Sequence, residues 1–391
     1  MIDLKAAREY MHANDVDGWL MYDFRGNNPV MWQVLGGAQA TSRRNFVWIP
    51  ARDEAICLIH VIDRLLFQGA AFPKREYLTW QEMHAALQDM LVGCKRVAME
   101  YSPNGALPMA AFVDAGTIEL IRSFGVDVTS SADLFQVAAA RWSATSVDLH
   151  RKACVEVLAT KDAAFEYIRD RLGRDDLTEY EVQQFIRTEF NRRGLITDHG
   201  PIVGVNQHSG DPHYEPGPDN HSPIRPGDWI LIDLWAKHAD PEGVYCDVTF
   251  TGYAGSAAPA KCREIFNLVA GARDRAIEIL QSAWKEGTVL QGWQVDDAAR
   301  KHIADAGYSK FFRHRTGHSM GPAPSPHALG ANIDNLETHD TRRLIPGVGF
   351  SIEPGVYLPE FGVRSEVDVY IDEIDGPTVT TEIQREPILV G

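Results

Sequence analysis

Residues 229–235 read WILIDLW, an apolar run with one acid, Asp233, near its centre. A run this apolar is typical of a strand that is buried on both faces, so the acid is expected to be buried with it. An ionised carboxylate in such surroundings is costly unless a positive charge compensates it. Similar stretches follow as far as Tyr370. The five polar residues in these stretches are Asp233, Asp247 in YCDVTF (245–250), His318 in RTGHSMG (315–321), Glu353 in FSIEPGVY (350–357) and Glu366 in GVRSEVDVYI (362–371).

Four carboxylates and an imidazole, with few cations close by in sequence, indicate a shared divalent cation or a pair of them. Asp233 and Asp247 stand fourteen positions apart on what should be neighbouring antiparallel strands, joined by the turn KHADPEG (237–243). Cross-strand neighbours can present two carboxylates on one face. The alternative is that each acid caps a turn or ends a strand at the surface. The apolar run around Asp233 argues against this alternative.

The stretch from Gly355 to Ile371 predicts a second hairpin, with Glu353 just before its first strand and Glu366 on its return. Arg364 precedes Glu366 by two residues, which places both on one face of a strand. Taken alone, this pair also fits an Arg–Glu contact at the surface, which would contribute little to stability.

The composition points to a globular protein of two domains. The chain has 391 residues, more than one ordinary core accommodates, with 45% apolar and 24% charged residues. It carries 38 Lys plus Arg against 54 Asp plus Glu, a net charge of −16. This balance disfavours nucleic acid and anionic membranes as partners.

The cysteines and the N-terminus favour a cytoplasmic protein. Five cysteines, an odd number, are spread widely and mostly lie among apolar neighbours, which fits reduced thiols rather than disulfides or a zinc cluster. The first twenty residues lack the apolar core of a signal peptide, and no apolar run is long enough to span a bilayer.

The chain is expected to have a mixed α/β (α+β) fold, with a compact α/β domain over 1–145 and a second domain over 146–391. The boundary is set by the polar, turn-like segment RWSATSVD (141–148). Periodicity predicts helices at 3–13, 80–92, 146–172, 177–193, 261–285 and 294–306, and strands at 18–22, 46–50, 55–62, 96–101 and within 199–253.

Four histidines lie in Gly- and Pro-rich loops, where functional groups are often displayed. They are His213, His314, His318 and His327. The motif GHSMG (317–321) also matches the nucleophile elbow of α/β-hydrolases, with Ser319 as nucleophile. We reject that interpretation because the preceding KFFRHRT is too polar for a central strand and the three prolines after the motif forbid a helix.

These motifs, in this order, resemble those of the pita-bread metallopeptidases, the family of Xaa-Pro dipeptidase (prolidase), Xaa-Pro aminopeptidase and methionine aminopeptidase. The resemblance covers roughly 146–391. The region 1–140 resembles the creatinase-type N-terminal domain of the proline-specific members, on layout alone. The motifs that carry the resemblance are GDPHYEP (210–216), GDWILIDLWAK (227–237), YCDVTFTGY (245–253), HRTGHSMG (314–321), FSIEPGVY (350–357) and GVRSEVDV (362–369).

The resemblance implies a site with two divalent metal ions, Mn, Co, Zn or Fe, and a metal-bridging hydroxide as the nucleophile. Asp247 and Glu366 would bridge the two ions, His318 and Glu353 would complete one, and Asp233 the other. Glu353 would also relay the proton to the leaving nitrogen. His213 and His327 match catalytic histidines that contact the substrate. His314 and Arg364 match substrate-binding positions, where either could hold a carboxylate.

Three residues depart from the family's usual pattern beside the expected ligands: Trp235, where a Gly is usual, Val244 and Phe250. They affect the surroundings of the ligands and not the ligands themselves.

We therefore expect a metallopeptidase that hydrolyses Xaa-Pro bonds in dipeptides, acting as a homodimer on small peptides. The short interval between Glu353 and Glu366 favours a prolidase over the main alternative, an Xaa-Pro aminopeptidase for longer peptides. Two further alternatives are another C–N hydrolase, as in creatinase, and a binding protein that has lost catalysis.

Overall fold

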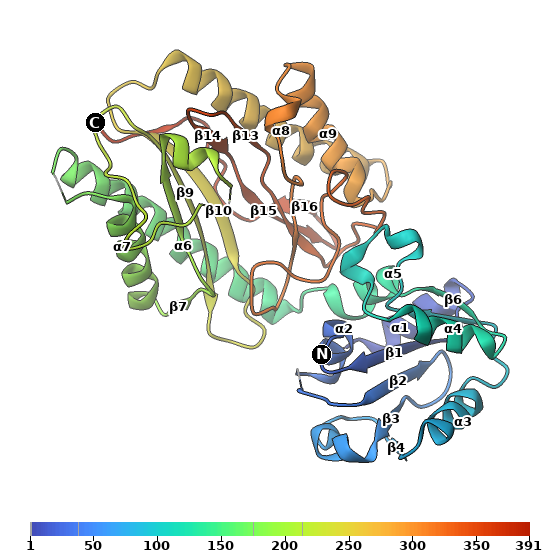
Figure 1. Cartoon of the computed structure of the whole chain (residues 1–391). Coiled ribbons are helices and arrows are strands. Elements are labelled where there is room, and N and C mark those ends of the chain that lie inside the picture. The colour runs from blue at the N-terminus through green and yellow to red at the C-terminus, as the bar shows by residue number, and fades with distance from the viewer. Residues whose placement is uncertain (1, 38, 175, 213) are drawn as a thin grey trace. The chain divides into compact units, whose positions relative to one another are not determined.

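The computed structural model describes residues 2–37, 39–174, 176–212 and 214–391. The chain divides into two compact units, Met1–Arg141 and Trp142–Gly391 (Figure 1). The assignment of domains to 1–145 and 146–391 stays a prediction.

The first unit is built on one six-stranded sheet in the order β4-β3-β2-β1-β5-β6. β1 pairs antiparallel with β2, and β2 with β3, whereas the β3–β4, β1–β5 and β5–β6 pairs are parallel. Its strands are β1 (Gly18–Phe24), β2 (Arg44–Pro50), β3 (Ile56–His60), β4 (Lys74–Tyr77), β5 (Arg96–Met99) and β6 (Asp127–Ser130). Its helices are α1 (Leu4–Ala13), α2 (Pro29–Leu35), α3 (Trp80–Met90), α4 (Ala115–Ser123) and α5 (Ala132–Phe135).

Local sequence signals explain where several of these helices begin. Asp3 caps α1 by accepting the Ala6 N–H, and Asp114 caps α4 by accepting the Thr117 N–H. α3 begins with a capping box between Thr79 and Glu82. The predicted helices at 3–13 and 80–92 are confirmed. The shorter α2 and α4 were not predicted, because seven to nine residues give a weak periodic signal.

The second unit begins with two helices and the strands that they cover. They are α6 (Ala144–Arg171), α7 (Glu179–Arg192), β7 (Leu195–Ile196), β8 (Ile202–Val205), β9 (Trp229–His238) and β10 (Cys246–Tyr253). β9 pairs antiparallel with β7, β8 and β10, and the last strand, β17 (Ile388–Leu389), joins β10 in parallel. The predicted helices 146–172 and 177–193 are confirmed.

The rest of this unit repeats the plan of two helices followed by antiparallel strands. The helices are α8 (Ala260–Lys285) and α9 (Gly292–Asp305), which confirm the predictions at 261–285 and 294–306. A four-stranded sheet runs in the order β11-β12-β15-β16, beside a separate hairpin of β13 and β14. These strands are β11 (Ser319–Met320), β12 (Gly349–Ile352), β13 (Gly355–Tyr357), β14 (Gly362–Arg364), β15 (Val367–Asp372) and β16 (Gly376–Val379).

The helices of the second unit pack on the sheets and form two apolar cores (Figure 1). α6 packs on β9 and β10, and α8 packs on β14 and β16. The two sheets meet along β10 and β15, which contact each other. In the described part of the chain, no helix has both the length and the apolar character that crossing a membrane requires. The mixed α/β fold expected from the sequence is therefore present, and its second unit holds the candidate site.

Candidate functional site

The first two acids of the site come from the antiparallel pair β9 and β10. In the register of this pair, Asp233 lies opposite Thr249 and Asp247 lies opposite Trp235. Both carboxylates are buried, with 7% and 5% of their residue surfaces exposed. The surface-cap alternative is thereby excluded for both residues, since acids at strand ends or turns would be open to water.

The other two acids lie where strands are interrupted. Glu353 stands between β12 and β13, and Glu366 between β14 and β15. The Glu353 N–H donates to the Thr316 carbonyl at 2.7 Å, and its Oε1 accepts from the Ser351 hydroxyl at 3.2 Å. Glu366 is buried, and its Oε2 accepts from the Thr249 hydroxyl at 2.7 Å. The interruptions thus allow acids to face the interior.

His318 presents an unprotonated nitrogen to the carboxylates. Its Nδ1 lies 3.2 Å from the Ser319 carbonyl oxygen. Because a carbonyl only accepts hydrogen bonds, Nδ1 carries the proton and Nε2 carries a lone pair. Nε2 lies 3.4 Å from Asp247 Oδ2 and 3.5 Å from Glu353 Oε1. Burial lowers the pKa of His318, which favours this neutral form.

Arg364 is enclosed next to these acids. Its Nη2 donates to Asp233 Oδ2, its Nε donates to the Thr249 hydroxyl at 2.8 Å, and its Nη1 donates to the Tyr357 hydroxyl at 3.4 Å. The surface-pair alternative for Arg364 and Glu366 is excluded, since both side chains are buried. In this structure the Arg364 guanidinium neutralises the Asp233 carboxylate. Contact between Arg364 and a substrate stays a prediction.

The crowding of acids raises their pKa values. Burial raises the pKa of Asp247 to about 7 and that of Asp233 to about 6, and it raises the pKa of Glu353 and Glu366 as well. Repulsion by neighbouring carboxylates adds to the shift for Asp233, Glu353 and Glu366. A cation bound among these carboxylates would oppose the shifts, because it would stabilise the charged form of each acid.

The residues present fit bound divalent cations. Asp247, His318 and Glu366 offer ligand atoms that all lie within 4.8 Å of one another. Asp233 Oδ1 is buried and has no hydrogen-bond partner among the described residues. The His318 Nε2 lone pair faces carboxylate oxygens, an arrangement that is repulsive unless a cation lies between them. Carboxylate oxygens with one imidazole nitrogen are suitable ligands for Mn²⁺, Fe²⁺, Co²⁺ or Zn²⁺.

The acids open onto a cavity of about 450 Å³. His314 lies in its wall, where its Nε2 accepts from the Tyr357 hydroxyl at 2.7 Å and burial lowers its pKa to about 3. The His327 ring packs against the His318 ring at a tilt of 32°, with ring centroids 3.9 Å apart. The structure thus brings together all the predicted site residues except His213, which lies outside the described residues. The cavity is lined by Asp198, His199, Ile202, Pro212, Asp233, Trp235, Asp247, His314, Arg315, His318, Ser325, Pro326, His327, Glu337, Glu353, Arg364 and Glu366.

Four ionisable residues of the cavity were not predicted from the sequence: Asp198, His199, Arg315 and Glu337. Trp235 was noted only as a departure. Its Nε1 donates to Asp198 Oδ1 at 2.7 Å, and its ring packs edge-on to His199. Arg315 stands inside the quoted motif HRTGH, yet a polar residue in a loop carries no signal of its own.

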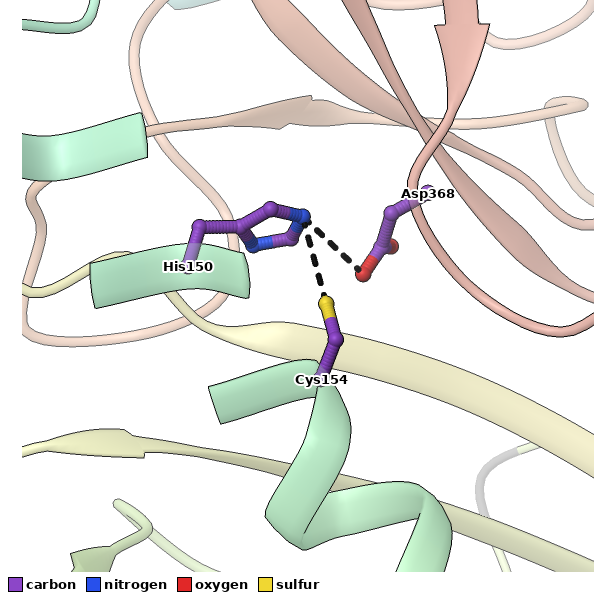
Figure 2. A group of neighbouring side chains, drawn as sticks. All are labelled: His150, Cys154 and Asp368. Carbon is purple, nitrogen blue, oxygen red and sulfur yellow. Dashed lines mark hydrogen bonds and ion pairs between the residues drawn. The ribbon is translucent and has the colours of Figure 1, made fainter. Parts of the chain in front are cut away.

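A second buried cluster is formed by His150, Cys154 and Asp368 (Figure 2). His150 Nε2 lies 3.4 Å from Cys154 Sγ and 3.9 Å from Asp368 Oδ2, and Asp368 Oδ2 accepts the Asp247 N–H at 3.0 Å. His150 Nδ1 lies 2.8 Å from the Tyr245 carbonyl, so Nε2 accepts from the Thr380 hydroxyl, 2.7 Å away. The lone pair of this histidine is already used within the protein, and we regard the cluster as support for the strand that carries Asp247.

The cysteine side chains agree with the expectation from the sequence that they are thiols and not disulfides. All five cysteines, Cys57, Cys94, Cys154, Cys246 and Cys262, are free thiols. The nucleophile-elbow interpretation of GHSMG is excluded, because Ser319 is buried in β11 and a Ser/Pro-rich loop follows it where a helix would be required.

Solved structures of peptidases share this fold. The crystal structure of dipeptidase PepE from Mycobacterium ulcerans superposes with a TM-score of 0.74, at 21% identity over 99% of this chain and 96% of that one. The prolidase from Pyrococcus horikoshii has a TM-score of 0.66, at 23% identity over 98% of this chain and 99% of that one. The expected pita-bread fold with an additional N-terminal domain is confirmed.

Curated relatives are peptidases by name. The Xaa-Pro dipeptidase of Lactobacillus delbrueckii subsp. lactis is 32% identical over 208 residues, covering 52% of this chain and 51% of that protein. The chain spans about half the length of most of the curated relatives that it matches, from 46% to 55%.

The model of metallopeptidase family M24 matches residues 148–373, more than half of the chain. The matched region contains every described residue of the candidate metal centre. The chain therefore belongs to metallopeptidase family M24.

Proposed function

We propose that this metallopeptidase hydrolyses Xaa-Pro bonds in dipeptides with the help of two divalent metal ions. The observation that carries the proposal is the convergence of the Asp247, Glu353 and Glu366 carboxylates on the unprotonated Nε2 of His318. Beside them lies Asp233, whose Oδ1 has no hydrogen-bond partner among the described residues. Such an arrangement is costly in a metal-free protein and favourable around cations.

In this proposal Asp247 and Glu366 bridge the two ions, His318 and Glu353 complete one site, and Asp233 completes the other. Asp233 can do this through Oδ1 while Oδ2 remains with Arg364. When bound, the ions would supply Lewis acidity and a water of lowered pKa. Their identity among Mn, Co, Zn and Fe is left to experiment.

The protein's own residues provide the proton transfer and the positioning. Burial of its carboxyl group raises the pKa of Glu353, which makes it a better proton acceptor, so it is proposed to take up a proton and pass it to the leaving nitrogen. Ser351 holds Glu353 Oε1 in place at 3.2 Å. His327, whose ring packs against His318, and His213 are proposed to contact the substrate around the scissile bond. His314 and Arg364 are proposed to lie on the substrate side of the site.

The choice of dipeptides rests on size and on relatives. A cavity of about 450 Å³ lies at the small end of the range for ligand sites, which suits a dipeptide. The Lactobacillus relative is named an Xaa-Pro dipeptidase, and two structures with the same fold are a dipeptidase and a prolidase. We also propose a cytoplasmic homodimer, as the sequence resemblance implies, with no nucleic-acid or membrane partner.

Metal analysis combined with hydrolysis of Gly-Pro and of a longer Xaa-Pro-containing peptide tests the proposal. We expect bound divalent metal, hydrolysis of Gly-Pro and much slower hydrolysis of the longer peptide. Comparable turnover of both would favour an Xaa-Pro aminopeptidase. Metal binding without hydrolysis of either would favour a binding protein.

The Asp247→Asn variant tests the site itself. Loss of a residue that only supports a metal ligand typically lowers metal affinity or activity by ~10–100-fold. We expect the loss of the ligand Asp247 itself to lower both by more than this. Unchanged metal content and hydrolysis in this variant would contradict the assignment of Asp247.

A further inference from the structure

The two arginines among the described residues of the cavity differ in what they already bind. Arg364 is enclosed, and each of its three guanidinium nitrogens has a partner: Thr249, Tyr357 or Asp233. Its charge is matched at close range by the Asp233 carboxylate. A substrate carboxylate would have to compete with Asp233 for Arg364.

Arg315 is more exposed than Arg364, and its charge is less closely matched. Its side chain keeps 19% of its surface exposed. Nη1 lies 3.8 Å from Glu337 Oε2, too far for a hydrogen bond, and Nη2 lies 3.3 Å from His327 Nδ1. A guanidinium has five N–H donors, so with respect to the described residues Arg315 retains donors for a planar, bidentate partner such as a carboxylate.

Arg315 lies beside the candidate metal centre. Its Nη2 lies 3.3 Å from His327 Nδ1, and the His327 ring packs against the ring of the proposed ligand His318, with centroids 3.9 Å apart. A carboxylate bound to Arg315 would therefore belong to a small substrate held at that centre.

The surrounding loops hold Arg315 in position. Its backbone N–H donates to Glu337 Oε1 at 3.2 Å, and the next residue, Thr316, is fixed to the buried Asp296 through its N–H and its hydroxyl. The turn that carries Glu337 is capped by Asp334, which accepts the Glu337 N–H at 3.0 Å. A side chain on such a base loses less entropy when a ligand binds.

Arg315 also defines the proton position on His327. A guanidinium cannot accept a hydrogen bond, so in their contact His327 Nδ1 is the acceptor and the ring proton is on Nε2. Loss of the Arg315 contact with His327 would change the hydrolysis of every substrate. Loss of a contact between Arg315 and a carboxylate would change only the hydrolysis of substrates with a free C-terminus. The two effects can therefore be separated.

We propose that Arg315 binds the C-terminal carboxylate of the substrate and thereby restricts this peptidase to dipeptides with a free carboxyl end. This inference rests on the proposed function. The sequence resemblance offered His314 or Arg364 for holding a substrate carboxylate; Arg315 takes that role here, while Arg364 stays paired with Asp233. Glu337 accepts the backbone N–H of Arg315, but its carboxylate lies 3.8 Å from the guanidinium, too far for a hydrogen bond.

The test compares Xaa-Pro dipeptides with their C-terminal amides on the metal-loaded protein. Wild type should prefer the free acid. Arg315→Gln should lower kcat/KM for the acid about 10- to 100-fold more than for the amide, mainly through KM, as expected for a lost hydrogen bond between charged groups. Arg315→Lys should retain part of the preference because it keeps the charge without the fork. Arg313→Gln, a change at an exposed arginine two residues away, should behave as wild type.

Calorimetric binding of proline and prolinamide to the same proteins gives a readout without turnover. If wild type binds proline more strongly than prolinamide and Arg315→Gln loses this difference, the inference is supported. If, in addition, no peptide is hydrolysed, the proposed function is overturned and the inference about Arg315 is not. Equal losses for acid and amide would overturn the inference and leave Arg315 as a residue that only positions His327. Equal binding of proline and prolinamide by wild type, or binding of neither, would also overturn it.

Discussion

At the scale of single residues, hydrogen-bond partners decide what each ionisable group can do. The Ser319 carbonyl sets the proton on His318, and Arg315 sets it on His327. Thr249 links the two sides of the site by donating to Glu366 and accepting from Arg364. Outer residues such as Thr249 orient the ligands, and their loss weakens metal binding indirectly.

Thr249→Val is expected to weaken metal affinity by ~10–100-fold, because the change keeps the shape of the side chain but removes the hydroxyl that orients Glu366. Thr249→Ser keeps the hydroxyl and should stay within a few-fold of wild type. Titration of the metal-free proteins with Mn²⁺ or Zn²⁺ measures both. Equal affinity of the Val and Ser variants would show that this hydrogen bond does not support the ligand.

The pH dependence of the metal-free protein follows from its buried acids. Burial raises the pKa of Asp247 to about 7 and of Asp233 to about 6, from 3.8. Between about pH 4 and 7 the folded chain therefore holds protons that the unfolded chain has released, so these groups stabilise less as the pH rises. We expect added metal to raise Tm by more at about pH 7.5 than at about pH 5. A metal-induced rise in Tm that shrinks as the pH increases would contradict this.

At the scale of elements, close backbone packing sets the position of His318. A Cβ on Gly317 would lie 1.9 Å from the Ser351 carbonyl oxygen, because β11 and β12 pair directly beyond it. A Cβ on Gly321 would meet the Ala328 Cβ at 3.4 Å, an ordinary contact. Two glycines on either side of His318 thus differ in the space around them.

Gly317→Ala is expected to lower the free energy of unfolding by about 1–3 kcal/mol, because β11 and β12 must separate to accept the methyl group. The shift should displace His318 and reduce activity. Gly321→Ala is the matched control and should stay within about 0.5 kcal/mol of wild type. Denaturant unfolding and dipeptide hydrolysis measure both effects. Equal behaviour of the two variants would contradict the packing argument.

The elements themselves were largely predictable. Helices from α6 to α9 have strong periodic patterns, and the hairpin of β9 and β10 follows from the apolar run around Asp233 and the turn after His238. The hairpin of β13 and β14 was also predicted, with Glu353 just before its first strand. The interruption at Glu366 was not predicted. Arg364 and Glu366 were expected on one strand, but β14 ends at Arg364 and β15 begins at Val367.

At the scale of the whole molecule, the described site residues all lie in the unit Trp142–Gly391. A ligand stabilises the part of a protein that must be folded to bind it. The unit Met1–Arg141 has its own sheet and its own apolar core. Metal binding should therefore stabilise the unit Trp142–Gly391 more than the unit Met1–Arg141.

Calorimetry of the full chain is expected to resolve two unfolding transitions, since each unit has a separate core. Adding a divalent metal should raise the Tm of one transition and leave the other nearly unchanged. Fluorescence of a probe attached to the exposed N-terminal helix α1 would assign the insensitive transition to the first unit. Equal metal-induced shifts of both transitions would contradict the separation.

The sequence by itself determined the fold class, the order of the helices and the identity of the acids and histidines that converge. These features are local: apolar periodicity, turn residues, and acids within apolar runs can be recognised without knowing what lies next to them in space. The motif order also sufficed for the resemblance to a family that the comparisons then confirmed.

Only the tertiary structure decided which charges neutralise one another and which remain for a ligand. Arg364 is paired with Asp233 across more than a hundred residues, and Arg315 lies beside His327 and Glu337 at the cavity. Electrostatic energy depends on distance and burial, and separation along the chain determines neither for residues that are brought together by folding.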